Sequence, residues 1–357
     1  MGTTATPPFN IAFRIMPALA AAVRVLLPIV LALFVSGFVL LVLGKNPLTY
    51  YAEVVQRGLF NWGGLQATIT RMTPLLLIAA GLVISFQAGI WNLGTDGQFL
   101  LAAVSTAALS PVLVSIMPWG LAVAISLAVA VIIGAAWSVL PAFLKASYGI
   151  NEIITSLMMS FLGVSLASVL VKIPFRDPST SVPQTLVLPV ADRLPRLFGT
   201  TIHSGILMAF AAVILVHVLM TRTAFGLKLR IVGANPRAAA HAGLSVAKLT
   251  FATFALSAAL AGLAGGIEIL GVQGTMRADW NPAYGLLVVP LVFLARFHAA
   301  GVIAFTLFFA VLMIGGESAS RRVGVPQHFV LLLVGMLLLF LAFVDYLDQR
   351  RRRLAKG

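Results

Sequence analysis

The chain contains no cysteine and few charged residues, since Lys, Arg, Asp and Glu together make up 10% of its 357 residues. Without cysteine there is no disulfide framework, no thiol nucleophile and no metal site with cysteine ligands. The shortage of charge excludes a water-soluble domain of this length, because such a domain needs a charged shell. Hydrophobic residues instead supply 60% of the chain.

Apolar runs of spanning length recur from Leu19 to Phe343. In hydrocarbon every backbone polar group must be paired within the protein, so these runs form helices or a closed barrel. Barrel strands alternate apolar and polar residues over about ten positions, whereas these runs are continuously apolar and longer. We therefore expect an all-α polytopic membrane protein with about ten transmembrane helices, some broken or partly spanning. They are expected near 20–43, 72–90, 98–116, 119–143, 150–171, 205–220, 250–271, 284–296, 301–317 and 327–346.

The distribution of basic residues predicts an orientation. The formal charge is +14, and the basic residues lie mostly in loops and in the tail after the last apolar run, not in one nucleic-acid-binding patch. The positive-inside rule then predicts that both termini are cytoplasmic. The apolar run after Arg14 and Arg24 is too long for a cleaved signal, so we interpret it as a retained helix.

Two loops interrupt the apolar pattern, and no linker suggests a second domain, so residues 1–357 are expected to form one transmembrane domain. Residues 172–203 contain five prolines and predict an irregular extracytoplasmic loop. Residues 221–249 are the longest polar stretch expected on the cytoplasmic side.

The cytoplasmic stretch contains the start and stop signals of a short helix. Asn235 suits the N-cap, Pro236 the first helical position and Gly243 the left-handed position after the end. The residues between them, including Arg237 and Ala239, are mostly alanine, so another surface could approach the backbone closely. The pattern predicts a docking helix for a partner; a plain connecting helix remains the alternative.

The chain lacks its own energy source and any recognisable catalytic constellation. No G-x-x-x-x-G-K-[ST] phosphate loop occurs, so energy must come from an ATP-hydrolysing partner or an ion gradient. No nucleophile–base pattern or H-E-x-x-H motif occurs either, so we expect neither an enzyme, nor a metal site, nor a cofactor.

Polar residues at membrane depth are costly and often line a transport route. Gln87, Asn92, Asp96 and Gln98 interrupt an apolar region rich in glycine, which predicts either the pathway or a polar turn. Asn151 and Glu152 open an apolar run, where capping accounts for them and a transport role stays open. Glu268 lies deep in an apolar span and either pairs with an arginine or lines the route. The candidate pathway residues are Gln87, Asn92, Asp96, Gln98, Asn151, Glu152 and Glu268.

Three stretches carry a family resemblance. Residues 86–98 (FQAGIWNLGTDGQ), 149–158 (GINEIITSLM) and 226–236 (GLKLRIVGANP) resemble, in this order, the permeases of ABC importers for simple sugars, nucleosides and branched-chain amino acids. The resemblance covers nearly all of the chain from about residue 70. It implies a bacterial inner-membrane permease that works with a second permease subunit, ATP-binding subunits and an extracytoplasmic solute-binding protein. It also implies that the loop around Asn235, Pro236, Arg237, Ala239 and Gly243 docks onto the ATP-binding subunit.

The substrate branch is less sharply defined. The stretch from Asn92 to Gln98, together with Glu268 to Val272, looks most similar to nucleoside-type permeases. The family commonly has Glu where this chain has Asp96, and this departure leaves the solute open. We expect a nucleoside first, a simple sugar second and a branched-chain amino acid third. The alternative class is an ion-coupled carrier that uses Asp96 and Glu268 as coupling carboxylates.

Overall fold

Helix α3 (Trp62–Gln87) and helix α11 (Val246–Glu268) lie at the centre of the larger of two units, which comprises residues 54–315. The computed structural model describes the backbone of residues 11–326 and 328–354. In the most apolar 18-residue stretch of α3, 78% of the residues are buried inside the protein, against 28% in the corresponding stretch of α7 (Glu152–Lys172). A helix that is apolar all round belongs in a protein interior, whereas one covered on a single side can face lipid. The sequence of α3 therefore suits the centre of a helical membrane protein.

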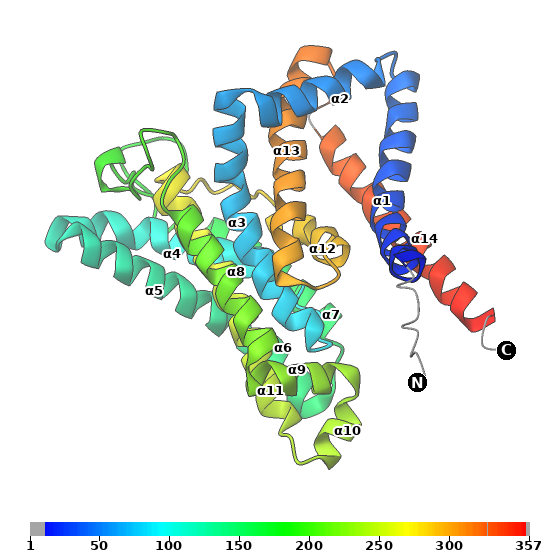
Figure 1. The fold of residues 1–357 in the computed structure, drawn as a ribbon. Helices are drawn as coiled ribbons and strands as arrows, with labels where there is room; N and C mark the ends of the chain where they lie inside the picture. Colours follow the sequence, from blue (N-terminus) through cyan, green and yellow to red (C-terminus); the bar gives the residue numbers. More distant parts are fainter. Residues whose placement is uncertain (1–10, 327, 355–357) are drawn as a thin grey trace, which may run out of the picture. The chain divides into compact units, whose positions relative to one another are not determined.

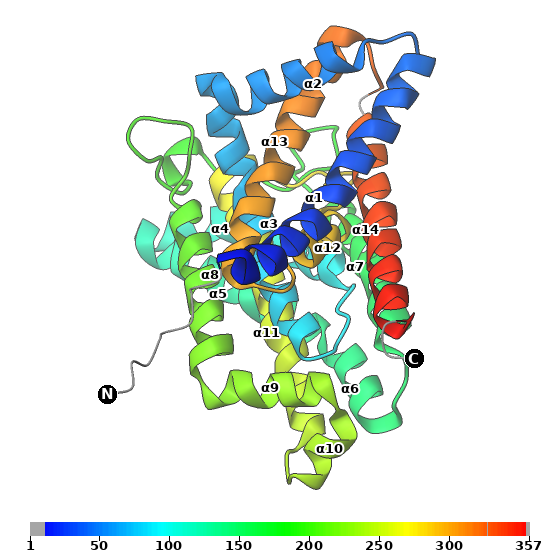
Figure 2. The same cartoon turned by 45° about the vertical axis from the view of Figure 1, so that its right-hand side comes forward.

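The remaining helices of this unit surround that pair (Figures 1 and 2). Helix α11 packs against α3, α4 and α5, and small residues let the backbones approach. A Cβ added to Gly134 of α5 would lie 2.8 Å from the Cα of Gly262 in α11. The surrounding elements are α4 (Thr95–Ile116), α5 (Trp119–Trp137), α6 (Val139–Tyr148), α7, α8 (Gly205–Arg222), α9 (Ala224–Ala234), α10 (Pro236–His241), α12 (Tyr284–Leu294) and the first part of α13 (Ala299–Val323).

The smaller unit contains residues 1–53 and 316–357, with α1 (Ile11–Val42), most of α2 (Pro47–Val55), the end of α13 and α14 (Phe329–Leu354). Its core is mostly aliphatic and includes an aromatic contact. The buried ring of Tyr50 makes an edge contact with Phe329, with ring centroids 5.3 Å apart. On its surface Arg322 and Glu53 form an ion pair at 3.5 Å.

All ten expected apolar segments coincide with helices. Seven of these helices in the described residues are long and apolar enough to cross a membrane, and the apolar parts of α1, α12 and α14 are shorter. The all-α polytopic prediction is therefore confirmed for the described residues. A count of ten spans, cytoplasmic termini and a single transmembrane domain stay predictions.

The expected irregular loop joins α7 to α8 and lies over the end of α11. Its backbone makes hydrogen bonds with the segment after α11: Leu194 N donates to Leu270 O at 2.8 Å, and Leu188 N donates to Gly274 O at 2.7 Å. Apart from a 3-10 turn at Val190–Asp192, residues 173–204 contain no helix. The proline-rich loop is therefore held by hydrogen bonds to the segment after α11, although it has almost no regular secondary structure.

The opposite end of this unit carries α9 and α10 (Figures 1 and 2). The side chain of Asn235 accepts a hydrogen bond from Ala238 N at 3.0 Å, Pro236 begins α10, and Gly243 has φ of +80°. The predicted punctuation of α10 is therefore confirmed. Helix α9, whose N-terminus is capped by Thr223, was not anticipated.

Candidate solute pathway and coupling helix

Asn92, in the connection from α3 to α4, and Gln98, in the first turn of α4, form a reciprocal pair. Asn92 Nδ2 donates to Gln98 Oε1, and Gln98 Nε2 donates to Asn92 Oδ1, both at 3.1 Å. Asn92 Nδ2 also donates to Ser257 Oγ on α11 at 3.1 Å. Both amides are almost fully buried, so these bonds satisfy groups that would otherwise be costly. The pair joins the connection to α11, and this geometry favours the polar-turn interpretation.

Asp96 and Gln87 attach the same connection to the region of α12. Asp96 Oδ1 accepts a hydrogen bond from Gly285 N at 2.6 Å, at the N-terminus of α12. A carboxylate suits this position because unpaired N–H groups and the helix dipole give a helix start a partial positive charge. Gln87 Nε2 donates to the carbonyl of Phe297, which follows α12, at 2.6 Å. Both contacts hold helices together, and a pathway role for either residue stays a prediction.

Asn151 and Glu152 occupy the positions that capping predicts. Asn151 Oδ1 accepts from Ile153 N at 2.9 Å, so it is the N-cap of α7. Glu152 forms an ion pair with Lys145 of α6 at 2.7 Å. These contacts fix the α6–α7 corner, and a transport role for the two residues stays a prediction.

Glu268 lines a polar cavity of about 290 Å³ in the described structure. Gln273 Nε2 donates to Glu268 Oε1 at 3.2 Å. The guanidinium of Arg71 on α3 places a positive charge near the carboxylate, which agrees with the arginine pairing considered from sequence. Arg71 Nη1 also donates to Tyr284 Oη at 3.0 Å, and the Arg71 guanidinium lies 5.8 Å from the Tyr284 ring centroid. The cavity therefore has a preorganised polar wall.

Sequence reasoning missed several residues of this cavity. They lie on α3, on the 173–204 loop and on the turn after α11, and include Thr70, Arg71, Arg196, Thr201 and Gln273. Arg71 carried a usable signal, because a basic residue at the edge of the apolar run that continues from 72 calls for an acidic partner. Thr70 carried none, because hydroxyls are common in membrane helices, and Thr201 carried none, because it lies in an irregular loop.

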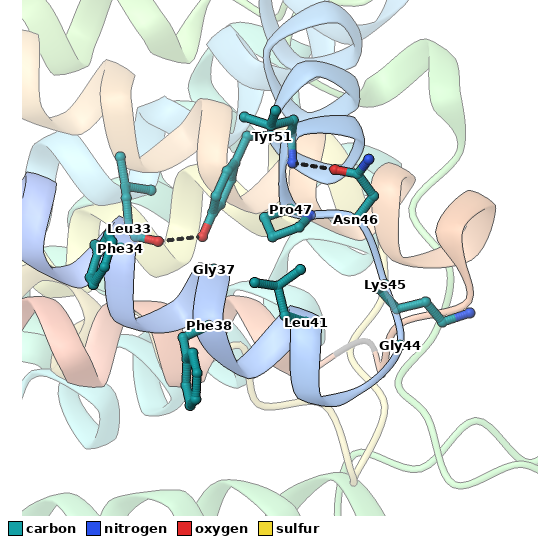
Figure 3. Close-up of a pocket in the computed structure, with 11 residues that line it drawn as sticks. Leu33, Phe34, Gly37, Phe38, Leu41, Gly44, Lys45, Asn46, Pro47 and Tyr51 are labelled. Atoms are coloured by element: carbon teal, nitrogen blue, oxygen red, sulfur yellow. Dashed lines mark hydrogen bonds between the residues drawn. The ribbon is translucent and has the colours of Figure 1, made fainter.

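A second hollow lies in the smaller unit between α1 and α2 (Figure 3). It has a volume of about 760 Å³ and is walled mainly by apolar side chains. Phe34 and Phe38 are largely exposed along it, and Tyr51 Oη donates to Leu33 O at 2.8 Å across it. An apolar groove of this kind suits lipid or protein contact and offers little to a polar solute.

The short helix α10 presents one face outwards and one inwards. Arg237 and Ala240 are exposed, whereas Ala239 is fully buried. The side chain of Ala239, one of the five residues expected to couple to the ATP-binding subunit, packs inside this chain, and the docking role of this segment stays a prediction. The exposed residues of α10 are Pro236, Arg237, Ala238, Ala240 and His241.

Comparison with known proteins places this geometry in a family. The profile of the family described as "Branched-chain amino acid transport system / permease component" matches residues 64–342. The chain is 34% identical to the glucose ABC transporter permease protein of Haloferax volcanii, over 95% of this chain and 91% of that one. It is 26% identical to the guanosine ABC transporter permease protein of Bacillus subtilis, over 89% and 92% of the two chains. It is 23% identical to a nucleoside ABC transporter permease protein of Lactococcus lactis, over 89% and 91%.

No solved structure matches the chain. The profile covers most of the chain, and the similarity to the glucose permease extends over nearly all of it. Together with the apolar helices, these matches indicate a multi-pass protein of the inner membrane. The chain therefore belongs to the family of ABC importer permeases that includes sugar and nucleoside permeases.

Proposed function

We propose that this chain is the membrane-spanning subunit of an ATP-driven importer and moves a neutral polyhydroxylated solute by alternating access. The observation that carries the proposal is that α10 and the 173–204 loop lie at opposite ends of one unit (Figures 1 and 2). Arg196 and Thr201 of that loop line the polar cavity. An exposed, capped helix at one end suits docking of an ATP-binding subunit. A cavity lined by hydrogen-bonding groups at the other end suits entry of a polar solute.

A continuous set of contacts connects these two ends. Gly233 of α9, directly before α10, lies against the end of α3: a Cβ added to Gly89 would be 3.0 Å from the Cα of Gly233. The Asn92–Gln98 pair then joins the α3–α4 connection to Ser257 of α11. Since α3 and α11 both line the cavity, a displacement of α10 would act on both walls. This is a physical route for coupling, which the variants below test.

The solute is a sugar or a nucleoside. Sequence motifs favoured the nucleoside, whereas the glucose permease is more similar to this chain than the nucleoside permeases are. This similarity supports a sugar at least as strongly as a nucleoside, and the polar character of the cavity is compatible with both.

The proposal includes three partners, by analogy with the family. ATP-binding subunits would dock on the exposed face of α10, and a solute-binding protein would deliver the solute at the end covered by the 173–204 loop. A second permease copy or paralogue would complete the translocation unit. The charge pattern predicts that α10 lies in the cytoplasm.

The test is uptake of radiolabelled D-glucose, uridine and guanosine by cells that express the chain with its partners. We expect uptake that stops when ATP is depleted and continues when a protonophore collapses the ion gradient at preserved ATP. The reverse pattern would contradict the proposal and support the ion-coupled carrier.

A further inference from the structure

We propose that the cavity beside Glu268 is a monosaccharide-binding subsite within a single permease chain. The inference rests on the proposed function and deepens it by naming the site and the class of solute. All of the lining residues lie within the larger unit. The cavity lies at the end covered by the 173–204 loop, where an imported solute would enter.

The polar groups of the cavity match the chemistry of a sugar. Each sugar hydroxyl both donates and accepts, so it binds best to planar groups that offer neighbouring donors or acceptors. Glu268 offers carboxylate oxygens, Gln273 an amide, and Arg71 and Arg196 guanidinium groups. Three of these are already oriented, because Gln273 bonds to Glu268 and Arg71 bonds to Tyr284. A ligand would therefore meet groups whose ordering is already largely complete.

The hydroxyl of Thr70 is an independent sign of a ligand. Thr70 is one of the residues that line the cavity, and its Oγ1 atom is buried and has no hydrogen-bond partner among the described residues. A buried hydroxyl normally has a partner, so an orphan hydroxyl in the wall of a cavity marks a place where a ligand or water can supply one. Across the cavity, Thr201 is already engaged, since its Oγ1 and its backbone N both donate to Gln66 Oε1.

The size and lining favour a monosaccharide over a nucleoside. A volume of about 290 Å³ is just below the range of about 300–1,000 Å³ for ligand pockets. No aromatic ring is among the residues that line it, so a nucleobase would have no surface for stacking. The one unbalanced charge, Arg196, is exposed at the rim, where solvent screens it. The interior charges of Glu268 and Arg71 offset each other, which suits a neutral solute.

The absence of cysteine allows a direct binding test on the full chain. Val272→Cys, at the cavity, would introduce the sole thiol, and Ala67→Cys on the α3 wall gives a second reporter. Phe198→Cys is the control, because Phe198 is 98% exposed in the 173–204 loop and is not among the residues that line the cavity. Each variant in membrane vesicles is treated with a small membrane-impermeant maleimide in the presence of D-glucose, uridine or L-leucine.

We expect D-glucose to slow labelling of Val272→Cys and Ala67→Cys several-fold, with no effect on Phe198→Cys. Adding Thr70→Val should raise the half-protecting glucose concentration about three- to tenfold, the effect of one lost hydrogen bond. This change removes no protein hydrogen bond, so the chain should fold. Ser110→Ala is its control: Ser110 Oγ is another buried hydroxyl without a partner among the described residues, and it lies outside the cavity.

Protection by uridine but not by glucose would overturn the inference, as would a half-protecting concentration that Thr70→Val leaves unchanged. Neither result would touch the importer proposal, because labelling requires no ATP-binding subunit. Conversely, glucose protection without ATP-dependent uptake of any solute would retain the subsite and contradict the importer.

Discussion

Gly233 of α9 lies against Gly89, the residue at which the chain turns after α3. A Cβ on Gly89 would lie 3.0 Å from the Cα of Gly233, and a Cβ on Gly233 would meet the carbonyl oxygen of Gln87. Gly89 has φ of +69°, a conformation that L side chains rarely adopt. Two glycines from separate sequence motifs thus form one backbone contact between α9 and the end of α3.

Replacing Gly233 by valine should therefore force α9 away from α3. Overpacking of this kind costs about 1–3 kcal/mol in the free energy of unfolding. We expect a lower thermal midpoint in detergent and a loss of solute transported per ATP hydrolysed. Gly120→Ala is the control, because a Cβ at Gly120 meets nothing within 4 Å; it should leave both values at the wild-type level. Wild-type coupling in Gly233→Val would contradict the route through α9.

The exposed face of α10 can be tested separately from its packing. Ala240→Arg places a bulky charge on the proposed docking face, so we expect it to abolish co-purification with the ATP-binding subunit without changing the thermal midpoint. Ala239→Arg should instead lower the midpoint, because Ala239 is fully buried. Ala247→Arg, exposed at the start of α11, should change neither. Normal co-purification of Ala240→Arg would exclude this face as the contact.

The two alanines show what the sequence could predict and what it could not. The cap at Asn235 and the stop at Gly243 depend on local backbone chemistry, so both were predictable. Which face of the helix is buried depends on α9, whose amphipathic pattern is too weak and too short to be recognised. The sequence therefore did not show that Ala239, one of the five residues given a docking role, packs inwards.

The candidate pathway residues show that sequence cannot identify contact partners that are distant along the chain. Asn92, Gln98 and Asp96 seemed suited to a solute route because polar groups at membrane depth need partners. The structure supplies those partners from α11 and α12, which are distant in sequence. Glu268 was identifiable because a carboxylate deep in an apolar run is rare, but the cavity around it needs Arg71 and Thr201 from other elements.

Removing the carboxylate of Asp96 should loosen the start of α12. The hydrogen bond from Gly285 N to a charged acceptor contributes about 1.5–3 kcal/mol, so Asp96→Ala should lower the thermal midpoint. Asp96→Asn keeps an acceptor oxygen and should lower the thermal midpoint by less. Asp279→Ala, which removes an exposed carboxylate, should have no effect. If Asp96→Ala lost transport while its midpoint stayed unchanged, the residue would belong to the pathway instead.

His203, in the 173–204 loop, makes the stability of the protein depend on pH. Burial lowers the pKa of this histidine from 6.5 to about 4. Its Nδ1 accepts a hydrogen bond from Gly205 N at 3.2 Å, so the neutral ring carries its proton on Nε2. Since a Cβ on Gly271 would clash with the ring, little room remains for water beside it. The native state therefore holds the neutral form.

The sign of the effect follows from the two pKa values. The unfolded chain takes up a proton as the pH falls below about 6.5, whereas the native ring stays neutral until about pH 4. The stabilisation that depends on neutral His203 is thus fully present above the unfolded pKa, and it decreases as the pH falls toward 4. From about pH 8 to about pH 5 we expect the free energy of unfolding to fall by about 2 kcal/mol because of this histidine.

Thermal unfolding in detergent at these two pH values measures the effect. His203→Asn should reduce the pH-dependent loss by most of this amount, because asparagine does not titrate. His217→Asn removes an exposed histidine from α8 and should leave the loss unchanged. All other titrating groups are common to the variants, so the difference between them isolates His203. An unaltered pH dependence in His203→Asn would mean that this ring is accessible to water and takes up its proton in the native state.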